Sequence, residues 1–100
     1  SNKNIKLNIK FKILWLENSL GLAIDQVNLN NYTPLTSYYF WPRSNVWEQT
    51  RFELNSKEWL AEREKIIILN KVTEILNSWQ KNTKNNLSQD KYVLDFIGTP

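Results

Sequence analysis

The side chains that could do acid–base or nucleophilic chemistry are few in this sequence. It has no His and no Cys, which excludes imidazole bases, thiol nucleophiles, disulfides and the usual zinc ligands. Its two glycines lie far apart and form no phosphate-binding loop. Ten carboxylates remain, and only Asp25 lies in an apolar, strand-like segment. An enzyme would need a pocket holding Asp25 and a second carboxylate, so we interpret Asp25 as a structural acid that hydrogen-bonds a nearby loop or helix start.

Three lysines near the start of the chain could bind phosphate. Lys6, Lys10 and Lys12 share one face of a segment in which polar and apolar residues alternate. Side chains two apart on a strand are about 6.6–7 Å from each other, which approximates the phosphate spacing of RNA. The alternative is a solvated face that protects a strand edge from aggregation. The residues alone leave both interpretations open.

Arg43 is the fourth candidate for a phosphate contact. It follows Trp41 and Pro42, where a strand is expected to give way to a helix. An Arg beside an exposed aromatic ring could grip a phosphate while the ring stacks on a base. The alternative places Trp41 in the core and pairs Arg43 with Glu48. A core position is favoured for Trp41, because small domains need their aromatic rings inside.

Residues 66–69 are four consecutive apolar residues in an expected helix. Successive helical residues turn by 100°, so this isoleucine turn must be covered on every side. We favour a sandwich between the sheet and the first helix. The alternative is that a partner protein covers one side, and Ile66, Ile67 and Trp59 are the candidate protein contacts.

The elements that position these residues follow from the hydrophobic pattern. Period-two alternation predicts a β-hairpin over residues 5–16 and 20–24, and an aromatic strand over 37–41 follows a loop at 28–36. Asn45 and Ser56 are candidate helix N-caps, for a helix over 46–54 and a longer one ending near 81. The stripe of that second helix is Ile68, Leu69, Val72, Ile75, Leu76 and Trp79. Residues 92–96 could form a closing strand. The predicted class is α+β, a small antiparallel sheet of three to four strands packed on two helices in the order β-β-β-α-α-(β).

Length and composition predict one domain. The chain of 100 residues is 41% hydrophobic, and we expect a domain over 1–100 with its core at about 5–81 and a C-terminal tail at 82–100.

The sequence has no apolar run that could span a membrane and no signal-peptide pattern. The net charge is +3, with a basic start and an acidic centre, so one side could touch RNA and another protein. Abundant Asn, Lys and Ile indicate A- and U-rich codons, as in many organelles.

An ordered set of motifs resembles a known family. The set is Leu-Trp-Leu-Glu at 14–17, Gly-Leu-Ala-Ile-Asp-Gln-Val at 21–27, Pro-Leu-Thr-Ser-Tyr-Tyr-Phe-Trp-Pro-Arg at 34–43, Trp-Glu at 47–48, Leu-Asn-Lys-Val-Thr-Glu at 69–74 and Trp-Gln at 79–80. It covers roughly residues 9–81 and resembles the plastid-specific ribosomal protein 3 family of chloroplasts and cyanobacteria. The Asn-rich stretches at 28–31 and 82–86 depart from that pattern.

The resemblance implies a non-catalytic, structural component of the small ribosomal subunit. Its partners would be small-subunit ribosomal RNA and neighbouring ribosomal proteins, with no cofactor, no membrane and no small-molecule substrate. It would reside in the plastid stroma, bound to the ribosome, or alternatively in a cyanobacterial cytoplasm; the codon bias favours the plastid. Lys6, Lys10, Lys12 and Arg43 are the expected RNA contacts. The competing class is a free-standing protein-interaction module that docks through its aromatic strand or the isoleucine turn.

Overall fold

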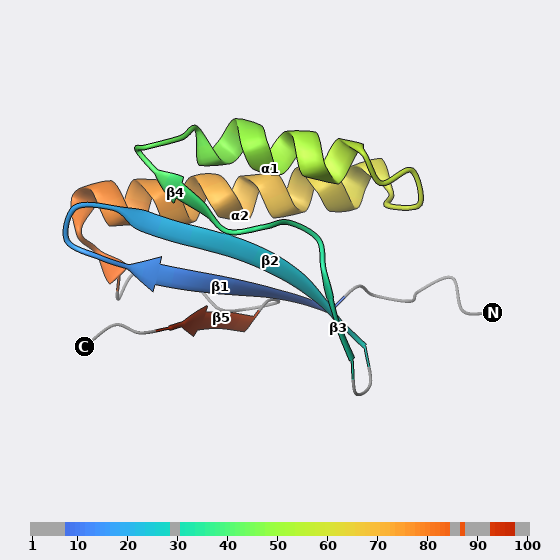
Figure 1. The fold of residues 1–100 in the computed structure, drawn as a ribbon, viewed down its shortest axis with the longest axis horizontal. Helices are drawn as coiled ribbons and strands as arrows, with labels where there is room; N and C mark the ends of the chain where they lie inside the picture. Colours follow the sequence, from blue (N-terminus) through green and yellow to red (C-terminus); the bar gives the residue numbers. More distant parts are fainter. Residues whose placement is uncertain (1–7, 29–30, 85–86, 88–92, 98–100) are drawn as a thin grey trace.

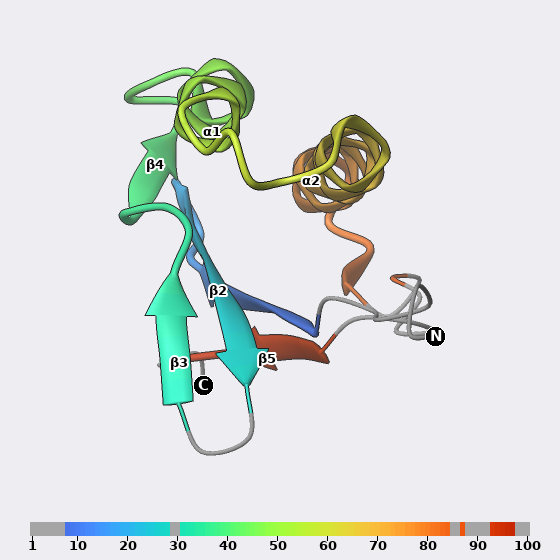
Figure 2. The ribbon, with the colours of Figure 1, turned by 90° about the vertical axis from the view of Figure 1, so that its right-hand side faces the viewer.

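A computed structural model describes residues 8–28, 31–84, 87 and 93–97. Two helices lie on one side of a twisted sheet (Figures 1 and 2). The strands are β1 (Ile9–Trp15), β2 (Leu20–Asn28), β3 (Asn31–Pro34), β4 (Tyr39–Trp41) and β5 (Val93–Phe96), and the helices are α1 (Val46–Asn55) and α2 (Glu62–Lys81). The predicted α+β class is confirmed.

The hairpin of β1 and β2 forms as the alternation predicts. The two strands are antiparallel, with Phe11 opposite Ile24 and Ile13 opposite Leu22. These four side chains are buried, and the alternate residues of β1 point to the other face. A backbone hydrogen bond of 3.0 Å from Leu16 N to Ser19 O closes the turn between the strands. Period two is a local property of the chain, which is why the sequence predicts this hairpin well.

β2 is long enough to pair with two short strands along the same edge. β3 pairs with its C-terminal half and β4 with its N-terminal half, both antiparallel. The sequence predicts a loop over 28–36, so β3 is a correction. Between the two short strands, Leu35 N and Thr36 N both donate to Ile24 O, and Ile24 N donates to Thr36 Oγ1 at 3.1 Å. These bonds hold the irregular segment between β3 and β4 to β2. The sequence does not predict them, because no alternation of polar and apolar residues marks this segment.

The closing strand β5 lies beside β1 and runs parallel to it. The sheet is therefore mixed, in the order β3-β2-β1-β5 with β4 also on β2, whereas the sequence indicates antiparallel pairing alone. A parallel neighbour requires a crossover connection, and the two helices lie in the long connection that returns the chain to β1. Leu94 of β5 and Leu87 belong to the same buried cluster as the hairpin.

The caps of the two helices differ from one end to the other, and the N-terminus of α2, at Ala61, has no side-chain cap. Asn45 is the N-cap of α1, and its side chain accepts a hydrogen bond from Glu48 N at 3.1 Å, as predicted. Ser56, predicted to cap the second helix, is instead the C-cap of α1. Its hydroxyl donates to Glu53 O at 2.7 Å. α2 begins only at Glu62 and ends at Lys81, and its C-cap Asn82 takes the left-handed conformation at φ 56° that Asn tolerates at a helix end.

The helices bury one face against the sheet. In α2, the residues Ile68, Val72, Ile75 and Leu76 are buried, while Leu69 and Trp79 pack against the cluster with part of their surface exposed. The predicted stripe is therefore confirmed. The isoleucine turn, however, is not covered on every side, because 56% of Ile66 is exposed. The expected sandwich is wrong for Ile66, since α1 and the sheet meet α2 on its opposite face.

Candidate nucleic-acid interface

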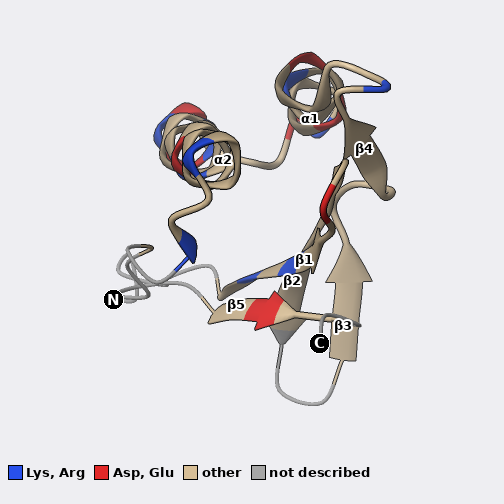
Figure 3. Cartoon of the chain, turned by 90° about the vertical axis from the view of Figure 1, so that its left-hand side faces the viewer, with Lys and Arg blue, Asp and Glu red and all other residues tan. Residues whose placement is uncertain are grey.

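The face of the sheet that points away from the helices carries the lysines that were predicted to contact RNA. Lys10 and Lys12 alternate with the core-facing residues of β1, and Lys6 lies outside the described residues. Each of the two lysines has a carboxylate partner: Lys10 Nζ lies 3.2 Å from Asp95 Oδ2, and Lys12 Nζ lies 3.1 Å from Asp25 Oδ2. Figure 3 shows the acidic part of β5 beside β1. The hydrogen bond to Asp95 is the main reason why the pKa of Lys10 is raised. This part of the face is therefore charge-compensated.

Aromatic rings cover the same lysines. Lys10 Nζ lies 4.9 Å from the ring centre of Tyr32, and Lys12 Nζ lies 5.4 Å from that of Tyr38. Tyr38 stacks in turn on Phe40, with the ring centres 6.3 Å apart. Such cation–π contacts are worth about 0.5–1 kcal/mol at exposed sites. The face thus presents tyrosine rings together with lysines, which can serve base stacking as well as phosphate contact.

The buried acid Asp25 has a structural explanation. Only 6% of it is exposed, and its partner is Lys12 on the neighbouring strand. The expected partner was a loop or helix start, so the ion pair across the hairpin corrects that detail. Among the described residues no cluster of His, Cys, Asp or Glu could hold a metal ion. The carboxylate therefore holds β1 to β2.

The turn between β4 and α1 presents Arg43 to solvent. Arg43 is exposed, and the turn around it is closed by a 2.8 Å hydrogen bond from Ser44 N to Phe40 O. Glu48, the alternative partner considered for Arg43, pairs with Arg51 at 3.0 Å instead. Within the described part of the chain Arg43 has no carboxylate partner. Its guanidinium group is thus available to an anion.

Trp41 lies beside this turn and is only partly buried, so the expectation of a core Trp41 needs correction. One side of Trp41 packs against the core. The other lines a pocket of about 340 Å³ between the turn and the C-terminal half of α2. The lining residues are Trp41, Asn45, Trp47, Thr73, Leu76, Asn77 and Gln80. The sequence alone does not indicate this pocket, although the spacing of 73, 76, 77 and 80 places these four residues on one helical face.

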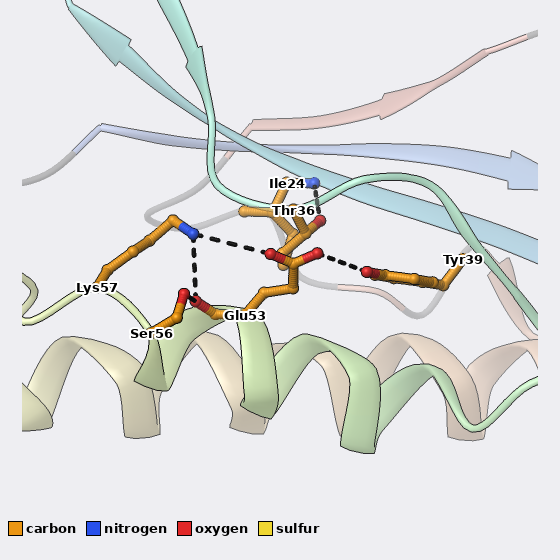
Figure 4. Close-up of polar contacts among 6 residues, drawn as sticks. All are labelled: Ile24, Thr36, Tyr39, Glu53, Ser56 and Lys57. Atoms are coloured by element: carbon orange, nitrogen blue, oxygen red, sulfur yellow. Dashed lines mark hydrogen bonds and ion pairs between the residues drawn. The ribbon is translucent and has the colours of Figure 1, made fainter.

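A polar cluster fixes β4, and with it the turn, to α1. Tyr39 OH donates a hydrogen bond to Glu53 Oε2, and Lys57 Nζ lies 3.9 Å from the other carboxylate oxygen (Figure 4). The hydrogen bond to Glu53 is the largest reason why the pKa of Tyr39 is raised above its usual value, and burial raises it further. The ionised phenol would face a carboxylate, so the bond requires the neutral form.

Replacing Tyr39 by Phe is expected to lower the free energy of unfolding by about 1.5 kcal/mol at pH 7, because a part-buried hydrogen bond to a charged group is lost. Because the pKa of Tyr39 is raised in the folded protein, its hydrogen bond stabilises the fold fully at a pH below the unfolded pKa of about 10. This stabilisation is lost as the pH rises through the pKa of the folded protein. Urea unfolding at pH 7 and above pH 10 measures both effects.

Tyr38→Phe is the matched control, because no described residue hydrogen-bonds the Tyr38 hydroxyl. The stability difference between Tyr39→Phe and the wild type should shrink at alkaline pH. Equal losses in the two variants, or a difference that persists at high pH, would contradict the role given to this bond.

Large apolar side chains are exposed on both helices and on the connection between them. Trp59 is 59% exposed and Ile66 56% exposed, while Ile67 is half-buried. Phe52 on α1 is 73% exposed and was not singled out in the sequence. The helical spacing could have predicted its exposure. Thr50 and Leu54 of α1 are buried, and Phe52, halfway between them, must point to the opposite side of the helix. We call Phe52, Trp59 and Ile66 the helix-end surface.

Comparison with known proteins bears on these features. Residues 35–82 match the family model of the plastid and cyanobacterial ribosomal protein (PSRP-3 / Ycf65). The chain is 52% identical over 93 residues to the small ribosomal subunit protein cS23 of Gracilaria tenuistipitata var. liui, which covers 89% of this chain and 94% of that protein. The chain belongs to this family. The predicted family is thereby confirmed.

More distant members of the family are also similar to the chain. Over 74 residues it is 51% identical to a probable cS23 of Synechococcus sp. (strain JA-2-3B'a(2-13)), covering 74% of the chain and 75% of that protein. Over 85 residues it is 39% identical to cS23z of Arabidopsis thaliana, covering 84% of the chain and 51% of the relative. Membership of a ribosomal protein family supports a structural role in place of an enzymatic one.

The segment matched by the family model contains most of the candidate surfaces. It includes Arg43, the whole pocket and the helix-end surface. Lys10 and Lys12 precede it. No helix among the described residues is long and apolar enough to cross a membrane.

Proposed function

We propose that the chain is a structural constituent of the small subunit of a plastid ribosome, where it binds ribosomal RNA and a neighbouring ribosomal protein. The observation that carries the role is family membership, at 52% identity over 93 residues to a small ribosomal subunit protein. A plastid is favoured over a cyanobacterial cytoplasm by the Asn, Lys and Ile bias of the sequence. The RNA and protein contacts are inferred from the surfaces described above.

The RNA-binding side is the β4–α1 turn together with the outer face of the sheet. Arg43 supports this most directly, because an exposed guanidinium without a carboxylate partner among the described residues is suited to bidentate phosphate contact. Lys10 and Lys12 contribute less, since Asp95 and Asp25 already compensate them. Lys6 remains a predicted contact. Such contacts position a protein on RNA without reading its sequence.

The protein-binding side is the helix-end surface with Ile67. Phe52, Trp59 and Ile66 expose large apolar areas, and Trp is common at the energetically dominant positions of interfaces. We further propose that residues 1–100 form one domain. Leu87 and Leu94 support this, because both share the core of the hairpin and helices.

The test of the RNA contacts is charge reversal. Changing Lys6, Lys10, Lys12 and Arg43 to Glu should weaken incorporation into the small subunit. Each lost phosphate contact should make the dependence of log affinity on log salt concentration shallower by about 1. Gradient sedimentation of subunits, with immunodetection of the chain in each fraction, measures the bound fraction at several salt concentrations.

The structure also provides a cleaner single variant. Glu at position 10 or 12 would face Asp95 or Asp25 and could destabilise the fold, whereas Arg43→Glu has no such neighbour. Arg63→Glu is the matched control, because Arg63 is exposed on α2 and away from the turn. Equal incorporation of Arg43→Glu and Arg63→Glu at every salt concentration would remove Arg43 from the interface.

The second candidate function is a free-standing interaction module that docks through the helix-end surface. The exposure of Trp59 and Ile66 favours it as much as it favours a ribosomal neighbour. The same gradient separates the two functions. A ribosomal constituent sediments with the small subunit after a moderate salt wash, while a free module stays at the top.

A further inference from the structure

We propose that the pocket between the β4–α1 turn and α2 receives an unpaired nucleobase of RNA, with Arg43 on the phosphate beside it. The inference deepens the proposed function and rests on it, since the small subunit supplies the RNA. It assigns a binding site and a ligand class to residues that the contacts proposed above leave unused. Its basis is the chemistry of the lining, the size of the pocket and the position of Arg43.

The lining combines aromatic faces with amides. Trp41 and Trp47 provide two indole rings, and Asn45, Asn77 and Gln80 provide three side-chain amides. Of the described residues, none that lines the pocket is charged. Aromatic rings stack on bases, and an amide matches the donor and acceptor groups on a base edge. Only an unpaired base could present both its face and its edge in this way.

The polar groups of the lining are free to bind. Asn45 Oδ1 accepts the capping bond from Glu48 N, which leaves its NH₂ group to donate. Within the described part of the chain, the side chains of Asn77 and Gln80 form no hydrogen bond, and neither do the indole N–H groups of Trp41 and Trp47. An apolar side chain from a neighbouring protein would cover these groups without partners, at a cost in free energy. A base would satisfy them.

Size and charge agree with this occupant. A volume of about 340 Å³ lies at the lower end of the range of about 300–1,000 Å³ for small-molecule sites. Arg43 is two residues from both Trp41 and Asn45, so its Cα lies within about 7 Å of theirs. A nucleotide whose base entered the pocket would carry its phosphate close to this guanidinium. The positive charge outside and the neutral lining inside complement a nucleotide.

Zero-length ultraviolet cross-linking of assembled small subunits tests the proposal. Irradiated subunits are digested with protease and nuclease, and mass spectrometry locates nucleotide adducts on the peptides of the chain. We expect an adduct on Trp41 or Trp47. In Asn77→Leu/Gln80→Leu, two hydrogen bonds worth about twofold to tenfold each are lost. The adduct yield should fall at least about fourfold relative to other adducts of the same subunit.

The matched control is Asn70→Leu/Gln49→Leu, which makes the same two changes at exposed positions outside the pocket. Its adduct yield should equal that of the wild type. Incorporated chain without an adduct on either tryptophan, or an adduct unaffected by Asn77→Leu/Gln80→Leu, overturns the nucleobase proposal. A cross-link to a neighbouring protein at these tryptophans overturns it in favour of a side chain. Failure of the wild-type chain to sediment with the subunit overturns the proposed function itself.

Discussion

Replacing Ile68 by Ala is expected to lower the free energy of unfolding by about 2–5 kcal/mol. Ile68 is fully buried and belongs to the hydrophobic cluster that joins α2 to the hairpin. Removing three side-chain carbons there loses their burial and leaves a cavity. A domain of this size is marginally stable, at about 5–15 kcal/mol, so the variant should unfold at a much lower urea concentration, followed by tryptophan fluorescence.

Ile66→Ala is the matched control, because it makes the same change two residues away in the same helix. Ile66 is 56% exposed, so its loss should alter stability by no more than about 0.5 kcal/mol. If the helix-end surface binds a ribosomal neighbour, Ile66→Ala should nevertheless reduce retention on the small subunit. Similar destabilisation by the two variants would contradict the orientation of α2.

Gly21→Ala is expected to destabilise the fold by about 1–3 kcal/mol, although a residue of this size usually fits a strand. A Cβ at Gly21 would lie 2.5 Å from Phe40 Cε2 and 3.1 Å from Leu14 Cβ. Moving the Phe40 ring aside would disturb its stacking on Tyr38. The ring would be forced away from β2, and β4 with it. Replacing Gly also restricts the unfolded chain, which offsets about 0.4–1 kcal/mol of the loss.

A double-mutant cycle with Phe40→Leu isolates this contact. The smaller, flexible side chain removes the ring that a Cβ would meet, so Gly21→Ala should cost less in the Phe40→Leu background. We expect a coupling energy of about 0.5–3 kcal/mol between the two positions, from urea unfolding of the four proteins. Additive effects would show that the clash is relieved elsewhere. Because β4 leads into the turn of Arg43, Gly21→Ala should also weaken binding to the subunit.

The sequence indicates some residues of the candidate site and not others. The sequence indicates Arg43 and Trp41, because an Arg beside an aromatic ring can bind a phosphate while the ring stacks on a base. The pocket next to them was missed, since its far wall comes from Asn77 and Gln80 of α2, more than thirty residues further along the chain. The sequence likewise suggests Trp59 and Ile66 but not Phe52.

The basic face of β1 shows why distant partners escape sequence analysis. The alternation of Lys10 and Lys12 with apolar residues correctly places them on one face. Whether that face is basic depends on Asp25, across the hairpin, and on Asp95, in a parallel strand at the other end of the chain. A pattern of residues along the chain predicts only the element that contains it. Which carboxylate compensates a lysine depends on which strand lies beside it, and the order of strands in the sheet decides that.

The sequence by itself determined the family and most of the elements, namely the hairpin, the aromatic strand and the two helices, but not β3. Alternation with period two, helical stripes and the Asn45 cap depend only on nearby residues, and the ordered Trp, Pro and Arg motifs identify a ribosomal protein. Only the tertiary structure decided that β2 carries two strands on one edge, that β5 is parallel, that Ile66 is exposed and that two tryptophans line a pocket. These features depend on which surfaces meet, because burial and charge compensation are properties of pairs of elements far apart in the chain.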